Sequence, residues 1–444
     1  MGGLRRLLDL AVRRWRPTAL LVLLLLVLSV DSPPPTSMEA RVDRQLTGSR
    51  FNFLTWEIGA AWRKLSHGLL APQRTMTEEA RHDFLLEYLA LVGEAQRLDG
   101  DIRNAYVDAE QTDAERATMD LQVRRDELRS EIRSRQALAE AILEEQVASV
   151  LVDEGFGAVG QELPPVRMHF TPLPQLLIIS PRDRIERVYQ LNLVHGLGTA
   201  EREAIEDEID ASFDVSSLVT DIGGLSAYPS MLLESSSVNW VTEVTAHEWT
   251  HHYLIPRPLG WHYLSSGQTR TINETVASIV GKEVGRRVVA RYYPEYLPPK
   301  EQAPPESPLE ESSEPAAFDF RLEMRETRVR VDDLLTEDKI EEAETYMEQR
   351  RQMFVEQGYA IRKLNQAYFA FHGAYADQPG AAGEDPIGPA VREVYSRSSD
   401  LYTFVNRLAP ITTLEELEAL LDELPQRTSI QVTGPHTSAV NSVS

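Results

Sequence analysis

The feature that most constrains the fold is the stretch of residues 77–152, which contains almost no proline or glycine. Charged residues alternate there with spaced apolar residues such as Leu128 and Ile132, a pattern typical of long helices with one buried face. We expect a helical hairpin, or a coiled-coil-like arm, that turns near Gly100. The heptad pattern is imperfect, so two interpretations of the charged residues stay open. They form a solvated helix face, or they belong to a surface for self-association or for a partner along the arm.

The rest of the chain predicts a mainly α fold with a small sheet (α+β). Residues 164–197 are rich in β-branched and aromatic residues with turn signals between them, which suggests a small antiparallel sheet. Helical patterns resume near Val238 and run to Tyr293, with a break near Pro256. After a segment rich in proline and glutamate, helical patterns return and continue almost to the C-terminal tail.

These changes in composition and hydrophobic periodicity divide the chain into six predicted regions. They are a membrane-anchor or signal segment (1–35), a juxtamembrane segment with the helical arm (36–153), a central domain (154–293), a linker (294–317), a C-terminal helical region that completes the central domain (318–425) and a flexible tail (426–444).

The N-terminal segment has a basic flank followed by an apolar run. Arginines dominate the flank, and the run from Pro17 to Val30 carries no charge. As a helix this run would rise about 21 Å, short of the roughly 30 Å of a hydrocarbon core, so it fits a signal peptide or a short anchor. Because no A-x-A cleavage site follows Val30, we expect a retained single-pass anchor in the cell membrane, with the N-terminus cytoplasmic. A cleaved segment would give a secreted protein, and a buried core helix is the third alternative.

The composition narrows the classes of function. The chain carries 69 acidic and 45 basic residues, a formal charge of −24, which disfavours binding to nucleic acid or to an anionic lipid surface. It has no cysteine, which excludes disulfides, thiolate catalysis, iron–sulfur clusters and cysteine-ligated zinc. Any metal must therefore be held by His, Asp or Glu.

The sequence "TAHEWTHHYL" begins at Thr245 and contains the pattern H-E-x-x-H. On a helix, His247 and His251 lie one turn apart on one stripe, which we expect to face inwards, and this spacing suits two ligands of a tetrahedral zinc. Glu248 could then accept a proton from a water activated by the metal. By chance the pattern is expected on the order of a few hundredths of a time in such a chain. The alternative is a partly buried helix with hydrogen-bonded histidines, the role that we assign to His252.

A catalytic zinc commonly has three protein ligands, so the motif predicts a third. Arg257 stands where the longest form of this motif would place another histidine. Glu274 follows in "RTINETVASIVGKEVG", where we expect a second helix to begin, and Ala277, Gly281 and Gly285 share its face. Such small residues let two helices approach closely, which would bring the carboxylate to the histidines; an exposed glutamate in a first helical turn is the alternative.

H-E-W-T-H followed by N-E-T-V-A-S resembles the gluzincin metallopeptidases over about residues 241–286. The resemblance implies a zincin-like catalytic domain with an active-site helix and a glutamate helix. It further implies that His247, His251 and Glu274 bind Zn²⁺. Glu248 would be the general base in the hydrolysis of a peptide or protein substrate. The chain as a whole is similar to membrane-anchored bacterial proteins described as predicted metallopeptidases.

The match to gluzincins has departures. Asn273 matches the Asn-Glu pair of many members, but Ser278 stands where thermolysin-like members place an aspartate that orients a histidine. The residue that orients a ligand histidine is therefore unidentified. The G-x-M-E-N segment of one large aminopeptidase family is absent, which speaks against that activity.

The mechanism that the resemblance implies needs a donor to the oxyanion, often a Tyr or His from a distant segment. Tyr368 and His372, one turn apart in "NQAYFAFHGAY", are the candidates, with Tyr263 and His262 behind them. Aromatic residues at this spacing also commonly fill a core. Substrate is expected along an edge strand within residues 224–232.

The competing class is a non-catalytic, membrane-anchored envelope scaffold or binding protein with a zincin-like domain. A purely structural zinc site has no need of a carboxylate at Glu248, which favours the enzyme.

Overall fold

The computed structural model describes residues 36–68, 72–107, 113–158, 160–298, 318–377 and 380–425. The chain divides into two compact units, residues 1–50 and residues 51–444. In the first unit, α2 (Met38–Gln45) begins after its N-cap Ser37, whose side chain accepts a hydrogen bond from the Ala40 amide, and η1 (Thr47–Ser49) follows. All other elements belong to the second unit, and the boundaries predicted after residues 153, 293 and 317 fall inside it.

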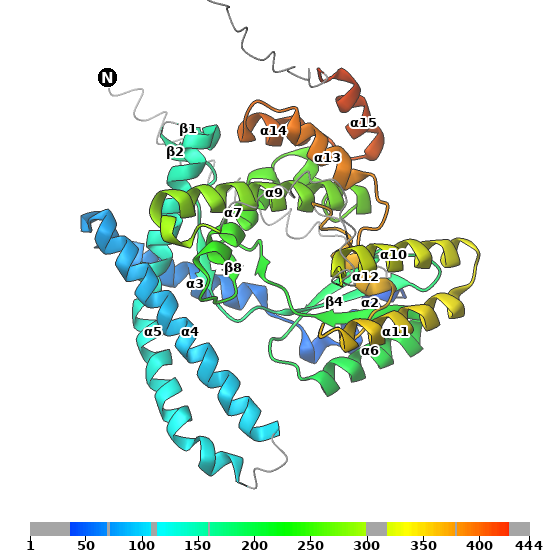
Figure 1. Ribbon diagram of the computed structural model, residues 1–444, viewed down its shortest axis with the longest axis horizontal. Helices are drawn as coiled ribbons and strands as arrows, with labels where there is room; N and C mark the ends of the chain where they lie inside the picture. The colour runs from blue at the N-terminus through cyan, green and yellow to red at the C-terminus, as the bar shows by residue number, and fades with distance from the viewer. Residues whose placement is uncertain are drawn as a thin grey trace, which may run out of the picture. The chain divides into compact units, whose positions relative to one another are not determined.

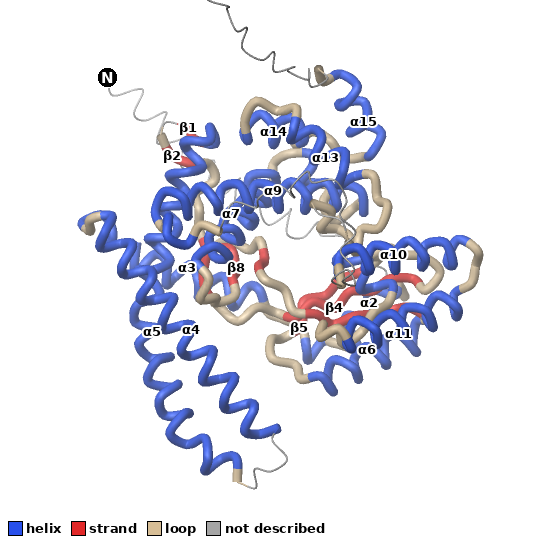
Figure 2. Tube along the Cα trace, in the orientation of Figure 1, coloured by secondary structure: helices blue, strands red, loops and turns tan. Residues whose placement is uncertain are grey.

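Helices make up most of the described chain, as predicted, and the strands are short (Figure 2). The remaining helices, beyond those discussed below, are α3 (Phe53–Gly68), η2 (Pro72–Thr75), η3 (Val152–Phe156), η4 (Pro294–Tyr296), α10 (Phe320–Thr336), α11 (Ile340–Glu356), α13 (Ile387–Ser396), α14 (Leu401–Leu408) and α15 (Leu414–Glu423).

The predicted arm consists of α4 (Glu78–Val107) and α5 (Ala114–Leu151), which lie side by side as a hairpin (Figure 1). Leu128 and Ile132 are buried between the helices and belong to the main hydrophobic core. The prediction of a turn near Gly100 is wrong, because α4 continues through it to Val107. A glycine inside a helix costs only about 1 kcal/mol, which packing of α4 on α5 outweighs.

A three-stranded antiparallel sheet confirms the predicted small sheet. Its order is β5 (Tyr189–Leu193), β4 (Gln175–Pro181) and β6 (Val215–Thr220). The helix α6 (Thr199–Phe213) connects β5 to β6, and α12 (Gln366–His372) packs its Phe371 on Leu176 and Ile178 of one sheet face.

Two further groups of strands lie near the H-E-x-x-H helix. The order of the larger group is β3 (Met168–Phe170), β8 (Ser230–Leu232) and β7 (Gly224–Leu225). This sheet is mixed, because β3 runs parallel to β8 whereas β7 runs antiparallel to it. The two-residue strands β1 (Gly157–Ala158) and β2 (Gln161–Glu162) form a small hairpin. Within this arrangement β7 is an edge strand.

The two helices that carry the motif residues pack against each other. They are α7 (Val238–Leu254) and α9 (Gly267–Tyr292), joined through the short α8 (Pro258–Trp261). Gly281 and Gly285 of α9 face Glu243 of α7: a Cβ atom would stand 2.9 Å from the Glu243 carbonyl oxygen at the first position and 2.8 Å from the Glu243 Cα at the second. The interpretation of the small residues as a close helix contact is therefore confirmed.

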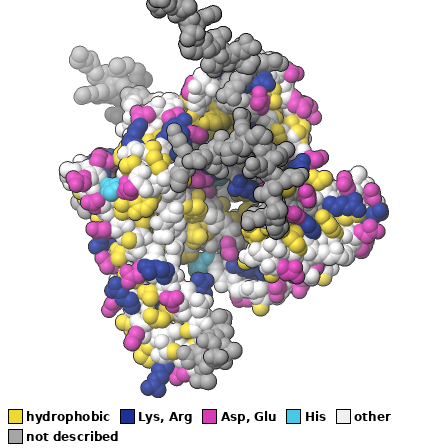
Figure 3. Space-filling view, in the orientation of Figure 1, with side chains coloured by type: hydrophobic (Ala, Val, Ile, Leu, Met, Phe, Trp, Pro, Cys, Tyr) yellow, Lys and Arg dark blue, Asp and Glu magenta, His cyan; other side chains and the backbone are white. Residues whose placement is uncertain are grey.

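Acidic side chains are spread over the face drawn in Figure 3, with Lys and Arg interspersed among them. The same view shows a hollow near the middle of this face, with basic side chains at its edge. Acidic side chains therefore do not gather in a single patch on this face.

The prediction of a single-pass membrane protein is contradicted by the described part of the chain. In those ranges, each helix is too short or too polar to cross a membrane. The run between Pro17 and Val30, on which the prediction rested, lies outside the described residues. The same holds for residues 299–317 of the predicted linker and for the predicted tail, residues 426–444.

Candidate metal centre

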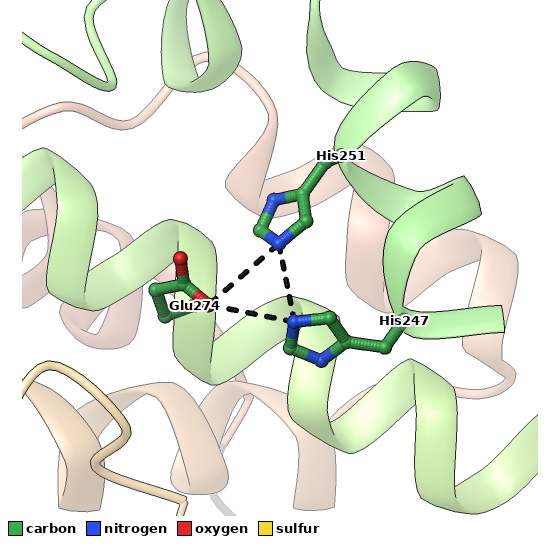
Figure 4. A group of neighbouring side chains, drawn as sticks. All are labelled: His247, His251 and Glu274. Carbon is green, nitrogen blue, oxygen red and sulfur yellow. Dashed lines mark hydrogen bonds and ion pairs between the residues drawn. The ribbon is translucent and has the colours of Figure 1, made fainter. Parts of the chain in front are cut away.

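The three predicted ligands converge on one point (Figure 4). His247 and His251 project from α7, and their Nε2 atoms are 3.2 Å apart. Glu274 projects from α9, and its Oε2 atom lies 3.4 Å from His247 Nε2 and 3.6 Å from His251 Nε2. One ligand atom from each residue lies within 4.8 Å of the other two.

The position of Glu274 along its helix decides between the two predicted alternatives. The helix α9 begins after its N-cap Ser266, whose hydroxyl accepts a hydrogen bond from the Thr269 amide. The prediction that the helix begins near Glu274 is therefore wrong, because Glu274 lies beyond the first turn. Glu274 is only 4% exposed. An exposed carboxylate that interacts with the N-terminal end of the helix dipole is therefore excluded, because Glu274 faces α7 from the interior of α9.

The sequence predicts that the stripe with His247 and His251 faces inwards. In the structure both histidines are only partly buried. The adjoining face of α7, with Val241, Thr245 and Trp249, is the one that packs into the interior. His252 lies on this deeper face and hydrogen-bonds the Ala227 carbonyl oxygen through Nε2 at 2.8 Å. Burial lowers its pKa. His252 thus has the structural role assigned to it, whereas His247 and His251 line a partly open site.

The electrostatics of the triad favour a positive charge at its centre. Burial alone would raise the pKa of Glu274, but His251 and His247 outweigh it and hold that pKa well below its usual value. In turn, burial alone would lower the pKa of His251, yet Glu274 raises it to about 9. The carboxylate and the imidazoles are therefore arranged to share a cation between them.

The donor set fits a zinc ion. Asn273 Nδ2 donates to the Leu259 carbonyl oxygen at 3.0 Å, which turns Asn273 Oδ1 towards His251 Nδ1 at 2.7 Å. His251 Nδ1 must then donate, so in the neutral imidazole, the form that binds a metal in place of the second proton, the lone pair is on Nε2 and faces the centre. Glu274 Oε2 is buried without a hydrogen-bond partner among the described residues. Two imidazole nitrogens and one carboxylate oxygen with such support are a common ligand set for zinc.

Tyr263 holds the other oxygen of the glutamate. Its hydroxyl donates to Glu274 Oε1, and its ring packs edge-on against His251 with the ring centroids 5.8 Å apart. Burial and then Glu274 raise the pKa of Tyr263, so it stays a donor. The sequence analysis names Tyr263 as a second-choice donor to the oxyanion. In the structure its hydrogen bond instead orients the ligand Glu274. His262, the other reserve candidate, is exposed and contacts Ser265.

Glu248 is buried beside the triad, with 5% of its surface exposed. The Ser226 hydroxyl donates to Glu248 Oε2. Gly224, at the edge strand β7, lies against the same carboxylate, and a Cβ atom there would stand 2.1 Å from Glu248 Oε1. The segment that contains β7 therefore sets the position of this side chain.

The structure does not bring Tyr368 and His372 to the triad. Their rings pack against each other on α12, with centroids 4.2 Å apart. Burial alone raises the pKa of Tyr368 to about 12 and lowers that of His372 to about 4. Within the described ranges, no contact joins either residue to a ligand, and their catalytic role stays a prediction.

Tyr375 is the residue of this segment that reaches the site. Its ring stacks on His247, with centroids 6.3 Å apart and 27° between the planes. Burial raises its pKa well above the usual value, and the carboxylates of Glu274 and Glu248 contribute to the increase. Because α12 ends at His372, the helical spacing used for the sequence prediction does not extend to Tyr375. The only signal in the sequence was another tyrosine in the same aromatic run.

Comparisons with protein-family models, with curated proteins and with solved structures found no match to this chain.

Proposed function

We propose that this protein is a zinc-dependent hydrolase of peptide bonds. The observation that carries the proposal is the convergence of His247 Nε2, His251 Nε2 and Glu274 Oε2 within 4.8 Å, beside the buried carboxylate of Glu248. These residues would hold the zinc, which when bound supplies Lewis acidity to a water and to a substrate carbonyl. The resemblance to gluzincins over residues 241–286 agrees with these roles.

Glu248 is the proposed general base and acid. Its Oε2 accepts the Ser226 hydroxyl hydrogen bond, which leaves Oε1 to accept a proton from the attacking water. Glu248 then delivers the proton to the leaving amine, as microscopic reversibility allows for one carboxylate acting in both steps. Burial beside Gly224 fixes the carboxylate, so that little reorganisation is needed during the reaction.

The peptide is proposed to lie along the edge strand β7. Among the described residues, β7 pairs with β8 alone, so its other edge is open to an extended substrate, and only the Leu225 carbonyl oxygen already accepts a hydrogen bond, from the Ala227 amide. The contacts of Gly224 and Ser226 with Glu248 place this edge next to the proposed base. A peptide added there would therefore pass the triad in an extended conformation.

Tyr375 is the proposed donor to the oxyanion. It stacks on one ligand, and burial, with a contribution from the nearby carboxylates, raises its pKa so that the hydroxyl stays protonated. A protonated phenol beside the ligands can donate a hydrogen bond to the negative charge that develops on the carbonyl oxygen.

The test is metal analysis combined with peptide hydrolysis. The wild type should bind one equivalent of zinc and cleave members of a broad peptide library, and a chelator should stop cleavage. Glu248→Gln should keep the zinc and lose cleavage, whereas Glu274→Ala should lose the zinc. Stoichiometric zinc without cleavage of any library member would reject the enzyme and favour a non-catalytic scaffold.

A further inference from the structure

Two arginines near the triad have buried guanidinium nitrogens that lack a hydrogen-bond partner among the described residues. Arg270 lies on α9, one turn before Glu274, and is 7% exposed. Its Nε atom has no hydrogen-bond partner in the described ranges. Arg187 lies in the connection between β4 and β5, and its Nε and Nη2 atoms are likewise buried without partners there.

The two guanidinium groups interact electrostatically with each other and with residues of the site. Burial, and then the charge of Arg187, lower the pKa of Arg270 to about 10. Arg187 also acts on the hydroxyl of Tyr263, which donates to Glu274, and on that of Tyr375, which stacks on His247. The two guanidinium groups form a positive region beside the proposed reaction centre.

Guanidinium nitrogens that are buried without a hydrogen-bond acceptor are costly, since they leave water without gaining another partner. Glu274 and Glu186 act on Arg270 through their charge, but neither accepts a hydrogen bond from its Nε atom. This chain has 69 acidic residues for 45 basic ones, so partners are not scarce. Elsewhere the chain does provide them: Arg182 binds Glu344 in a fork at 2.8 Å, and Arg362 binds the buried Glu206. The missing partner at Arg187 and Arg270 therefore points to a ligand.

We infer that Arg187 and Arg270 form a subsite that binds a carboxylate of the substrate next to the scissile bond. This inference rests on the proposed function for the identity of the substrate as a peptide. The guanidinium fork matches the planar carboxylate group, and the only anions that an unmodified peptide offers are carboxylates. That carboxylate belongs either to the C-terminus of the peptide or to an Asp or Glu side chain.

The binding test uses the full chain carrying Glu248→Gln, loaded with zinc, so that peptides bind without being cleaved. Calorimetry compares three peptides of otherwise identical neutral sequence: one with a free C-terminus, one amidated, and one amidated with an internal aspartate. At least one carboxylate peptide should bind about 10- to 100-fold more tightly than the neutral amide, as expected for charge-assisted hydrogen bonds. Which of the two does so identifies the source of the carboxylate.

Adding Arg187→Gln or Arg270→Gln should remove most of this preference and leave the affinity for the neutral amide nearly unchanged. The matched controls are Arg184→Gln, on the same connection as Arg187, and Arg286→Gln, on α9 like Arg270; both side chains are more than half exposed. These controls should keep the preference. Circular dichroism and zinc content verify folding, and Arg270→Lys replaces Arg270→Gln if the latter does not fold.

Equal binding of all three peptides, or an equal loss for charged and neutral peptides in the arginine variants, would overturn the inference. A preference for a carboxylate in a protein that cleaves nothing would reject the proposed function and keep the subsite. Cleavage by the wild type, combined with binding that ignores the carboxylate, would reject the subsite alone.

Discussion

Gly224 lies against the carboxylate of Glu248 so closely that a Cβ atom would stand 2.1 Å from Glu248 Oε1 and 2.8 Å from its Cδ. Gly224 belongs to the edge strand β7, whereas Glu248 belongs to α7. The proposed base and the proposed substrate strand are therefore in direct contact, and the absence of one side chain permits it.

We predict that Gly224→Ala displaces Glu248 and lowers kcat/KM by roughly 100-fold, since a displacement of about 1 Å can cost that much. The zinc content should not change, because Gly224 contacts none of the ligands in the described contacts. Gly267→Ala is the matched control, since a Cβ atom there meets nothing within 4 Å. Activity near that of the wild type in Gly224→Ala would contradict the role given to Glu248.

Asn273 is predicted to set the affinity for zinc through His251. Asn273→Ala removes the acceptor of His251 Nδ1 and should weaken zinc binding about 10- to 100-fold, measured by competition with a chelator. Asn273→Asp keeps an acceptor at that position and should bind zinc more tightly than the alanine variant. If all three proteins bind zinc equally, Asn273 does not orient the ligand.

Removing the hydroxyl of Tyr375 and removing that of Tyr368 should have different effects on kcat, because only Tyr375 is the proposed donor to the oxyanion. We expect Tyr375→Phe to lower kcat about 100- to 1000-fold without changing zinc content, because it removes one donor to the developing charge. Tyr368→Phe should leave kcat within a factor of about 3, since its ring packs on His372 and Phe369 and has no contact with a ligand in the described ranges. The reverse result would restore the sequence-based candidate.

Glu140 is predicted to make the stability sensitive to acid. Its carboxylate pairs with Lys64 at 2.6 Å and with His169 at 2.8 Å, and it accepts from the Phe170 amide, which joins α5 to β3. Burial alone would raise the pKa of Glu140, but Lys64 and His169 outweigh it and lower the pKa to about 2. The folded state therefore binds this proton less readily than the unfolded chain does.

A lowered carboxylate pKa stabilises the fold above the unfolded value of about 4.5 and loses that contribution as the pH falls towards 2. The contribution is roughly 3 kcal/mol at neutral pH, at about 1.4 kcal/mol for each pKa unit. Urea unfolding of wild type and Glu140→Gln should show a difference in stability that shrinks between pH 4.5 and pH 2. Glu131→Gln, partly exposed on the same helix, is the control and should show no such change. A difference independent of pH would contradict the assignment.

Local periodicity determined much of this protein. The helices of the arm and the pairing of His247 with His251 follow from the helical repeat of 3.6 residues, which acts between neighbours in sequence. The sequence also predicted the third ligand, Glu274, because the small residues on its helix face indicated a close contact between two helices. Gly281 and Gly285 make this contact with α7.

Only the tertiary structure decided which residues surround the ligands. Asn273 supports His251 because its amide is turned by the Leu259 carbonyl group, and Ser226 reaches Glu248 from a different element. Tyr375 stacks on His247 from beyond the end of α12 at His372, where the helical spacing no longer applies.

Tertiary packing also determines that Arg187, in a connection between strands, acts electrostatically on Arg270 of α9. Such interactions depend on how separate elements pack, and a pattern that repeats along a single helix or strand carries no information about the side chain that a distant segment will place beside it.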